Sequence, residues 1–477
     1  MELSDSWAWA EENFGDCDLG DKRRTKRLVD YCARQAMHPE VTTNSLCGAD
    51  LALREASYRL LENPQIAADD IAEGPFEKTA AACGDESLIL AIQDTTMASF
   101  SHSATEYLGN IGGAKGSTNR GFVIHSTLAY APKSQRIVGL LDQCRWIRPQ
   151  KRVGRNKRKS VPYEKKETFK WEAAARRYGK RIEDSSKVIS VCDREADIFE
   201  FLNYHVSDGH RFVVRACHNR CLQTEQKEHV WEYMKSRDVI GSYELALAQR
   251  GPMRGSKNHG KRPGRRASIA GMEVRASQIT LIPSNPNKHR DPKPLKVYAI
   301  YVTQNQITQD EDKKPIEWML LTSEPVHGLK DARRIIGYYE NRWLIEEFHK
   351  AWKTGCRMEE RRFQDAHTLE RMLVILAFVA VRMLQLRASA ALNPDIDACE
   401  ILHEDELKLL AGLAKKRKRK TPKKKTAQWA MGEIASLVGW FKTKQNPRPG
   451  WQSLWKGWAK FTSMFDGYTL AKELQEM

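Results

Sequence analysis

Two acidic residues of the chain follow apolar, strand-like segments, where a sheet could hold them rigidly as metal ligands. Asp94 ends the run LILAIQ, and Asp193 ends the run VISVC. An acid in this position can equally cap a following helix, so each residue alone has a structural alternative. Carboxylates that hold two Mg²⁺ ions about 4 Å apart clamp the attacking and leaving oxygens of a phosphodiester. Two such acids on two strands therefore indicate metal-assisted phosphodiester chemistry.

A third acid lies in the segment YYENRWLIEEFHKAWKTG, within a helical region that we expect to run, with breaks, from near Leu329 to Leu386. At about 100° per residue, Tyr339, Arg342, Glu346 and Lys353 fall on a stripe about 60° wide, and Glu347 points away from it. Glu346 could complete a metal pocket while the two cations grip adjacent phosphates. The alternative is an exposed helix with an i,i+4 ion pair between Arg342 and Glu346.

The elements that must position these residues alternate between strand and helix. The runs SLILAIQDTT, VIHSTLAYA and RIVGLLDQCRWIR predict three strands of an antiparallel meander. The segments KVISVCD, READIFEFLNYH and HRFVVRA follow in the order strand, helix, strand, which is a parallel crossover unit. A meander joined to a crossover makes a mixed sheet, so we predict an α+β fold.

Helical and basic segments flank this sheet. Residues 1 to about 80 read as helical, and a helix that opens after Gly20 and Asp21 carries Arg23, Arg24, Lys26 and Arg27. This basic cluster is either a solvated helix face or a face that contacts phosphates.

Further basic runs interrupt the rest of the chain. Residues 151–166 are basic and strand-free, and residues 217–326 predict an inserted antiparallel unit with a basic tip at 254–266. The C-terminal region, beyond Asn393, is predicted to be helical, and we interpret its run KKRKRKTPKKK (415–425) as a disordered loop that attracts DNA.

Composition narrows the class of protein. The chain has 477 residues, with 78 Lys and Arg against 61 Asp and Glu, and the net charge of +17 favours a polyanionic partner. Gly (29) and Pro (18) make up about 10% of the chain, which excludes a collagenous or low-complexity protein. The ten Cys are scattered, and the nearest pair, Cys217 and Cys221, lacks a second pair at zinc-site spacing, so we expect reduced thiols.

Two further features bear on location. The N-terminus MELSDSWAWAEENF lacks the basic-then-apolar pattern of a secretory signal. The longest clean apolar run, Met372 to Val381, is ten residues long, whereas a membrane span needs about 20. We therefore expect a cytoplasmic protein with no membrane domain.

These segments together resemble a known family. The pattern Y-x₂-R-x₃-E-x₆-K, with IQDTT and VCDREAD upstream, is similar to the Y-R-E-K group of bacterial insertion-sequence DDE transposases. The resemblance covers nearly the whole chain, because further blocks match in order: LGDKRRTKRLV, ASYRLLENP, RGFVIHS, WIRP, FKWEAAA, RFVVR, LLTSEPV, RWLIEEFHKAWKTG and VAVRMLQLR.

The resemblance implies a ribonuclease-H-like mixed-sheet catalytic core at residues 81–388, interrupted by a β-rich insertion at about 217–326. It also implies a helical DNA-end recognition domain at 1–80 and a helical C-terminal dimerisation domain at 389–477. Asp94, Asp193 and Glu346 would form the metal-binding triad for two Mg²⁺ ions, for which Mn²⁺ is expected to substitute. The expected partners are double-stranded DNA, as transposon ends and target, and a second copy of the chain, with no small-molecule cofactor.

The resemblance further implies DNA-contacting roles for eight residues. Tyr339, Arg342 and Lys353 would hold phosphates around a flipped base, against which Trp318 would stack. Trp318 could instead be a core residue of an amphipathic strand, and Trp343 is a weaker candidate. Arg215 would contact DNA, and Arg24 and Arg27 would read the terminal repeat. The rival interpretations are a stand-alone nuclease and a non-catalytic DNA-binding repressor.

Overall fold

The computed structural model describes residues 5–102, 106–112, 119–149, 161–247, 267–283, 293–305, 315–392, 395–443 and 449–476. The predicted basic tip at 254–266 and most of the basic stretch at 151–166 lie outside these residues.

One mixed sheet runs through the described part of the molecule, in the order β2-β3-β1-β5-β6-β10-β9-β8-β7, with β4 paired to β3. Its strands are β1 (Ile89–Phe100), β2 (Gly109–Asn110), β3 (Arg120–Ala131), β4 (Arg136–Trp146), β5 (Val188–Cys192), β6 (Arg211–Arg215), β7 (Gly241–Leu247), β8 (Ser268–Leu281), β9 (Leu295–Gln304) and β10 (Glu317–Thr322).

The centre of the sheet confirms the predicted meander and crossover. Strands β1, β3 and β4 pair antiparallel, whereas β1, β5 and β6 are parallel neighbours. The sequence placed Asp94 at the end of its strand, and this was wrong. β1 continues to Phe100 and stays paired with β3, so Gln93 ends only the continuously buried part of the strand.

The insertion extends the same sheet instead of forming a separate one. Strands β7 to β10 pair antiparallel, as predicted, and β10 continues the order by pairing with β6. Residue Leu320 of β10 lies opposite Arg215 of β6. The segment between residues 217 and 326 therefore leaves and returns to the central sheet beside the end of β6.

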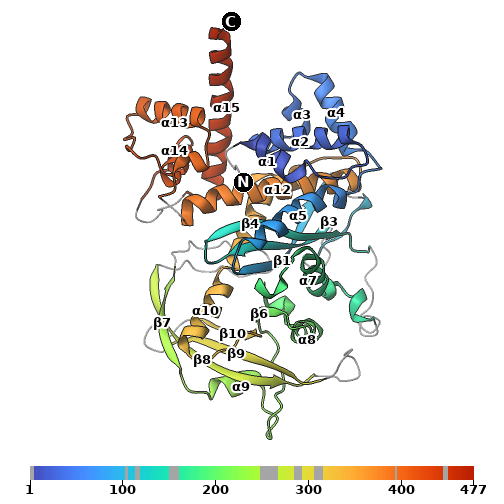
Figure 1. Cartoon of the computed structure of the whole chain (residues 1–477), viewed down its shortest axis with the longest axis vertical. Coiled ribbons are helices and arrows are strands. Elements are labelled where there is room, and N and C mark those ends of the chain that lie inside the picture. The colour runs from blue at the N-terminus through green and yellow to red at the C-terminus, as the bar shows by residue number, and fades with distance from the viewer. Residues whose placement is uncertain are drawn as a thin grey trace.

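Helices cover both faces of the sheet (Figure 1). Because successive strand residues face opposite sides, Ile189 and Val191 pack in the cluster that contains α12, whereas Phe212 and Val214 pack in the cluster that contains α8. The first face carries α10 (Leu329–Glu340), α11 (Trp343–Lys350) and α12 (Ala366–Leu392). The second carries α7 (Lys170–Arg181), α8 (Phe199–Ser207) and α9 (Val230–Lys235).

The N-terminal region is helical, as predicted, and its first four helices lie beyond α12 from the sheet, whereas the fifth packs against β4 (Figure 1). Asp21 caps α2 by accepting a hydrogen bond from the Arg23 amide at 2.8 Å, which confirms the predicted start of this helix. The helices are α1 (Ser6–Phe14), α2 (Lys22–Met37), α3 (Thr43–Cys47), α4 (Leu51–Leu61) and α5 (Ala68–Gly84).

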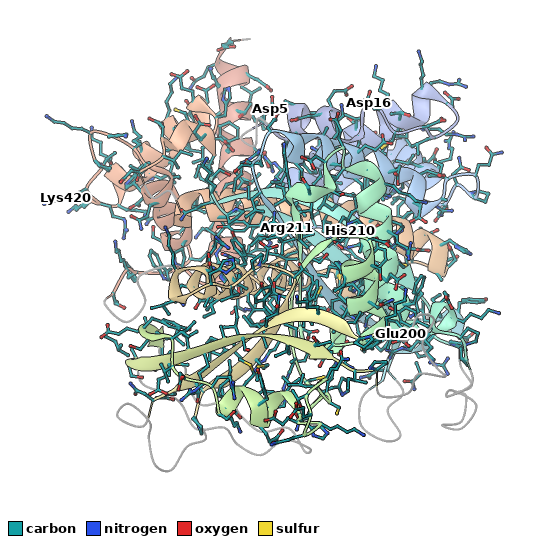
Figure 2. The ribbon with its side chains drawn as sticks, turned by 60° about the horizontal axis from the view of Figure 1, so that its bottom comes forward. Asp5, Asp16, Glu200, His210, Arg211 and Lys420 are labelled. Atoms are coloured by element: carbon teal, nitrogen blue, oxygen red, sulfur yellow. The ribbon has the colours of Figure 1, made fainter. Side chains whose placement is uncertain are left out.

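The C-terminal region contains α13 (Glu404–Lys416), α14 (Ala427–Ser436) and α15 (Trp451–Glu476), which projects away from the sheet (Figure 1). The prediction that residues 415–425 are disordered was wrong for the first residues of this run. The run starts inside α13, and Arg419 pairs with the buried Glu433 of α14 at 2.9 Å. Lys420 lies exposed at the outer edge of these helices (Figure 2).

Within the described residues, no helix combines the length and the apolar character that a bilayer span requires. The predicted buried run, Met372 to Val381, lies inside α12 and is at most 5% exposed at each residue.

Candidate functional site

Asp94 lies on β1, and Asp193 directly follows β5, the parallel neighbour of β1. Ile92 of β1 lies opposite Val191 of β5, and each acid comes two residues later in the chain. Side chains alternate along a strand, so both acids face the side of the sheet that α11 covers. Asp193 also caps a short 3₁₀ turn by accepting from the Glu195 amide at 2.8 Å, so its structural alternative holds as well.

Arg342 joins the third acid to this pair. Its guanidinium is 3.8 Å from Asp94 Oδ2 and is hydrogen-bonded to Glu346. The i,i+4 ion pair that the sequence offered as an alternative is therefore present, but at a position that also faces the sheet. The side chain of Glu346 is 48% exposed, whereas those of Asp94 and Arg342 are 19% exposed.

This helical region has breaks, as predicted. α10 ends at Glu340, α11 begins at Trp343, and a π-helical turn follows at Ala351–Gly355. At the first break the Asn341 side chain donates to the Gly337 carbonyl at 2.7 Å, and the Arg342 amide donates to the Tyr339 carbonyl at 3.0 Å instead of continuing the i→i−4 pattern. Tertiary packing gathers members of the stripe near the sheet.

The surroundings of Asp94 and of Asp193 raise the pKa of both groups. Burial, together with the charges of Asp193 and Glu346, raises the pKa of Asp94 to about 6, against the Thr95 amide hydrogen bond and Arg342. Burial also raises the pKa of Asp193, with Glu195 adding to the effect. This crowding of negative charge in a half-buried site suits a divalent cation, since a cation would relieve it.

Lys353 lies against the strand that carries Asp94. Its Nζ donates to the Met97 carbonyl at 2.6 Å and is 3.7 Å from Glu359. Glu359 in turn accepts from the Ser99 amide of β1 at 2.8 Å. The ammonium group is thus fixed at the same strand as the first acid.

Tyr339, Arg215 and Trp318 form a second group beside the acids. Arg215 is hydrogen-bonded to Tyr339, and its Nη2 donates to the Glu317 carbonyl next to Trp318 at 3.3 Å. Burial raises the pKa of Tyr339, an effect that Arg342 and Arg215 oppose. Trp318 is partly buried and packs against the main core, as expected for a core residue of an amphipathic strand. Its indole N–H is buried with no hydrogen-bond partner.

Trp343 lies apart from this group. Its side chain is 49% exposed and lines a cavity of about 310 Å³ with residues of the C-terminal helices, including Trp429 and Glu433 of α14. The structure therefore separates the two candidate tryptophans: Trp318 is on β10 of the sheet, and Trp343 faces the C-terminal region.

Sequence reasoning missed His349. Its Nδ1 is 3.8 Å from Asp94 Oδ2, its side chain is 10% exposed, and its Nε2 is buried without a partner. Burial lowers the pKa of His349 to about 3, with Lys353 and Arg342 adding to the effect, so the imidazole is neutral. Its position three residues after Glu346, on the same helix face, was the signal that could have found it.

Among the described residues, the group of metal-ligand side chains whose ligand atoms lie within 4.8 Å of one another is Asp197, Cys217 and His218, whereas the three predicted acids are not gathered this closely. The carboxylate of Asp197 is already used, because Arg220 and two backbone amides donate to its two oxygens. This cluster is therefore a poor cation site. The ten cysteines are all free thiols.

The predicted end-reading arginines are on α2. Arg27 is exposed, whereas the guanidinium of Arg24 donates to the Leu19 carbonyl at 3.0 Å and to Gln65 Oε1 at 2.5 Å. Arg27 is therefore able to reach a ligand along the face of α2. Arg24 instead links the start of α2 to the loop that follows α4.

Residues 6–66, which span α1 to α4 and the following loop, match the family model described as transposase DNA-binding. The match supports a DNA-binding transposase. It also supports DNA as the partner of this basic protein, and it contains the predicted contact residues Arg24 and Arg27.

Proposed function

We propose that the chain is a Mg²⁺-dependent DDE transposase of the Y-R-E-K group, similar to the cut-and-paste transposase of the composite kanamycin-resistance transposon. The observation that carries this proposal is the placement of Asp94 on β1 and of Asp193 directly after the parallel strand β5, with Arg342 between Asp94 and Glu346. The match of the N-terminal helices to the transposase DNA-binding model supports the DNA-binding part of this proposal.

The core is proposed to be ribonuclease-H-like. The strand order β4-β3-β1-β5-β6, antiparallel on the first three strands and parallel on the last three, supports this assignment. Asp94 on its central strand and Asp193 on the next would then be the two sheet-borne acids of the triad.

Asp94, Asp193 and Glu346 would hold two Mg²⁺ ions. When bound, these ions would make water or a 3′-hydroxyl more nucleophilic and would stabilise charge on the scissile phosphate. Arg342 would move from Glu346 to a phosphate oxygen, because a metal neutralises the carboxylate that it now pairs with. Lys353, fixed at Met97, would hold the neighbouring phosphate.

The proposed reaction nicks the transposon end, and the freed 3′-hydroxyl attacks the opposite strand to give a hairpin. The hairpin is reopened before the end joins target DNA. Trp318 would stack on a base turned out of the DNA helix. Tyr339 and Arg215 would contact the adjacent backbone.

Two copies of the chain would act together on paired ends. The outer part of α15 exposes Tyr468, Leu470 and Leu474, which are 38%, 56% and 63% exposed. An apolar stretch of this kind on a projecting helix suits the proposed dimer contact.

The test is incubation of the full-length protein with Mg²⁺ and linear DNA that bears the element's own ends. Hairpins and strand-transfer products are expected. Simple nicks without joined products would identify a stand-alone nuclease instead, and retarded but uncut DNA would identify a repressor.

A further inference from the structure

Glu347, the neighbour of the proposed metal ligand Glu346, faces the C-terminal helices instead of the sheet. Adjacent helical residues point about 100° apart, so the two carboxylates serve different surfaces. Glu347 is 8% exposed, and its Oε2 accepts from the Trp451 indole N–H of α15 at 2.5 Å. A buried carboxylate on a helix that carries catalytic groups needs such partners, because an unpaired charge there is costly.

Two cations complete the surroundings of Glu347. Lys350 of α11 donates to its Oε1 at 2.6 Å, and Arg387 of α12 is bonded to its Oε2. The Arg387 guanidinium also lies over the Trp451 ring, 4.3 Å from the centroid. Residues of three helices, α11, α12 and α15, therefore meet at this one carboxylate.

A second tryptophan of α15 contacts the far end of the segment from Glu347 to Gly355. Trp455 of α15 donates to the Gly355 carbonyl at 2.5 Å, at the end of the π-helical turn that contains Lys353. A Cβ on Gly355 would lie 2.6 Å from Met383 Cε and 3.1 Å from the Trp455 ring, so a larger residue would have to displace these side chains. The π-turn itself departs from regular helix, so it needs an outside contact to fix its shape.

We propose that Glu347 is a positioning residue through which α15 sets the orientation of α11, and with it Glu346 and Lys353. Trp451 and Trp455 are spaced one helical turn apart and bracket the segment from Glu347 to Gly355. The inference rests on the proposed function, since the groups that are positioned are the proposed phosphate and metal groups. Docking of α15, the proposed dimer helix, would thereby be coupled to the chemistry.

The test uses Trp451→Phe in the full-length protein, which removes one N–H and keeps most of the ring. The matched control is Trp429→Phe, because the Trp429 indole N–H is buried without a partner, so its removal breaks no hydrogen bond. Two readouts are compared: the single-turnover rate of DNA-end cleavage, and hydrogen exchange of the amides in residues 343–350.

Trp451→Phe is expected to slow cleavage about 10-fold and to speed exchange in α11, with the affinity for end DNA within about twofold of the original. Trp429→Phe should change neither. In a Glu347→Leu background, the effect of Trp451→Phe on cleavage should largely disappear, because leucine offers no acceptor for the indole N–H and the contact is already lost.

The proposal is overturned if Trp451→Phe matches the control in both readouts, or if either readout changes without the other. Failure of the proposed function would look different: the unmodified protein would not cut DNA ends at all. In that case the exchange comparison alone decides whether α15 holds α11 through Glu347.

Discussion

Lys353 donates its ammonium hydrogen to the carbonyl of Met97, three residues beyond Asp94 on β1. The π-helical turn after α11 and the strand of the first acid are therefore joined directly, although 256 residues separate them in the chain. This contact places a positive charge beside the acids without neutralising them, since Lys353 pairs with a carbonyl and lies near Glu359.

Lys353→Met should slow end cleavage about 10- to 150-fold, because a charge-assisted hydrogen bond contributes about 1.5–3 kcal/mol. Single-turnover nicking measures this effect. The control is Lys330→Met, an exposed lysine on α10, which should leave the rate unchanged. Equal rates for both variants would remove Lys353 from the site.

Glu346→Gln should abolish detectable cleavage and leave end binding nearly intact, because the amide keeps the shape but loses the charge that a metal ligand needs. Cleavage and gel retardation are measured on the same DNA. The control is Glu360→Gln, a nearby exposed acid that pairs with Arg357. Substantial cleavage by Glu346→Gln would contradict the proposed triad.

Parts of this site could be predicted from the sequence and parts could not. Asp94 and Asp193 follow apolar runs that mark neighbouring strands, so local pattern was sufficient to find them. The sequence predicted breaks in this helical region, but helical periodicity does not locate the one at Asn341. Helical spacing could place His349 beside Glu346, but the contact of His349 with Asp94 depends on packing between distant segments.

Trp318→Ala should impair hairpin formation more than first-strand nicking. Loss of base stacking costs about 1–3 kcal/mol, which corresponds to a rate loss of about 5- to 150-fold at the step that needs the flipped base. Separate rates for nicking and hairpin formation are obtained from a time course. Equal slowing of both steps would mean that Trp318 acts only as the core residue its partial burial also allows.

Arg27→Ala should weaken binding to end DNA and lower the slope of log K against log salt by about 1, as expected for one lost phosphate contact. Arg27 is exposed on α2, inside the region that matches the transposase DNA-binding model. Binding is measured at several salt concentrations. An unchanged slope would show that this helix face does not contact phosphate.

His205 should make the fold sensitive to acid. Burial lowers the pKa of His205 to about 3, with His210 adding to the effect and the Phe201 carbonyl opposing it. Its Nε2 is 2.9 Å from Ser190 Oγ on β5, and Ser190 also contacts Tyr178 at 2.6 Å, so the neutral ring is held in a buried hydrogen-bonded chain.

In the unfolded chain His205 takes up a proton near pH 6.5, whereas in the folded protein it does not. The free energy of unfolding therefore keeps its full value above that pH and decreases as the pH drops toward 3. Between pH 6.5 and 5 the loss is about 2 kcal/mol from this residue. In His205→Gln the difference between urea midpoints at pH 7 and pH 5 should shrink, whereas in His229→Gln, with an exposed side chain, it should not. The same pH difference in both variants would assign the acid sensitivity to other groups.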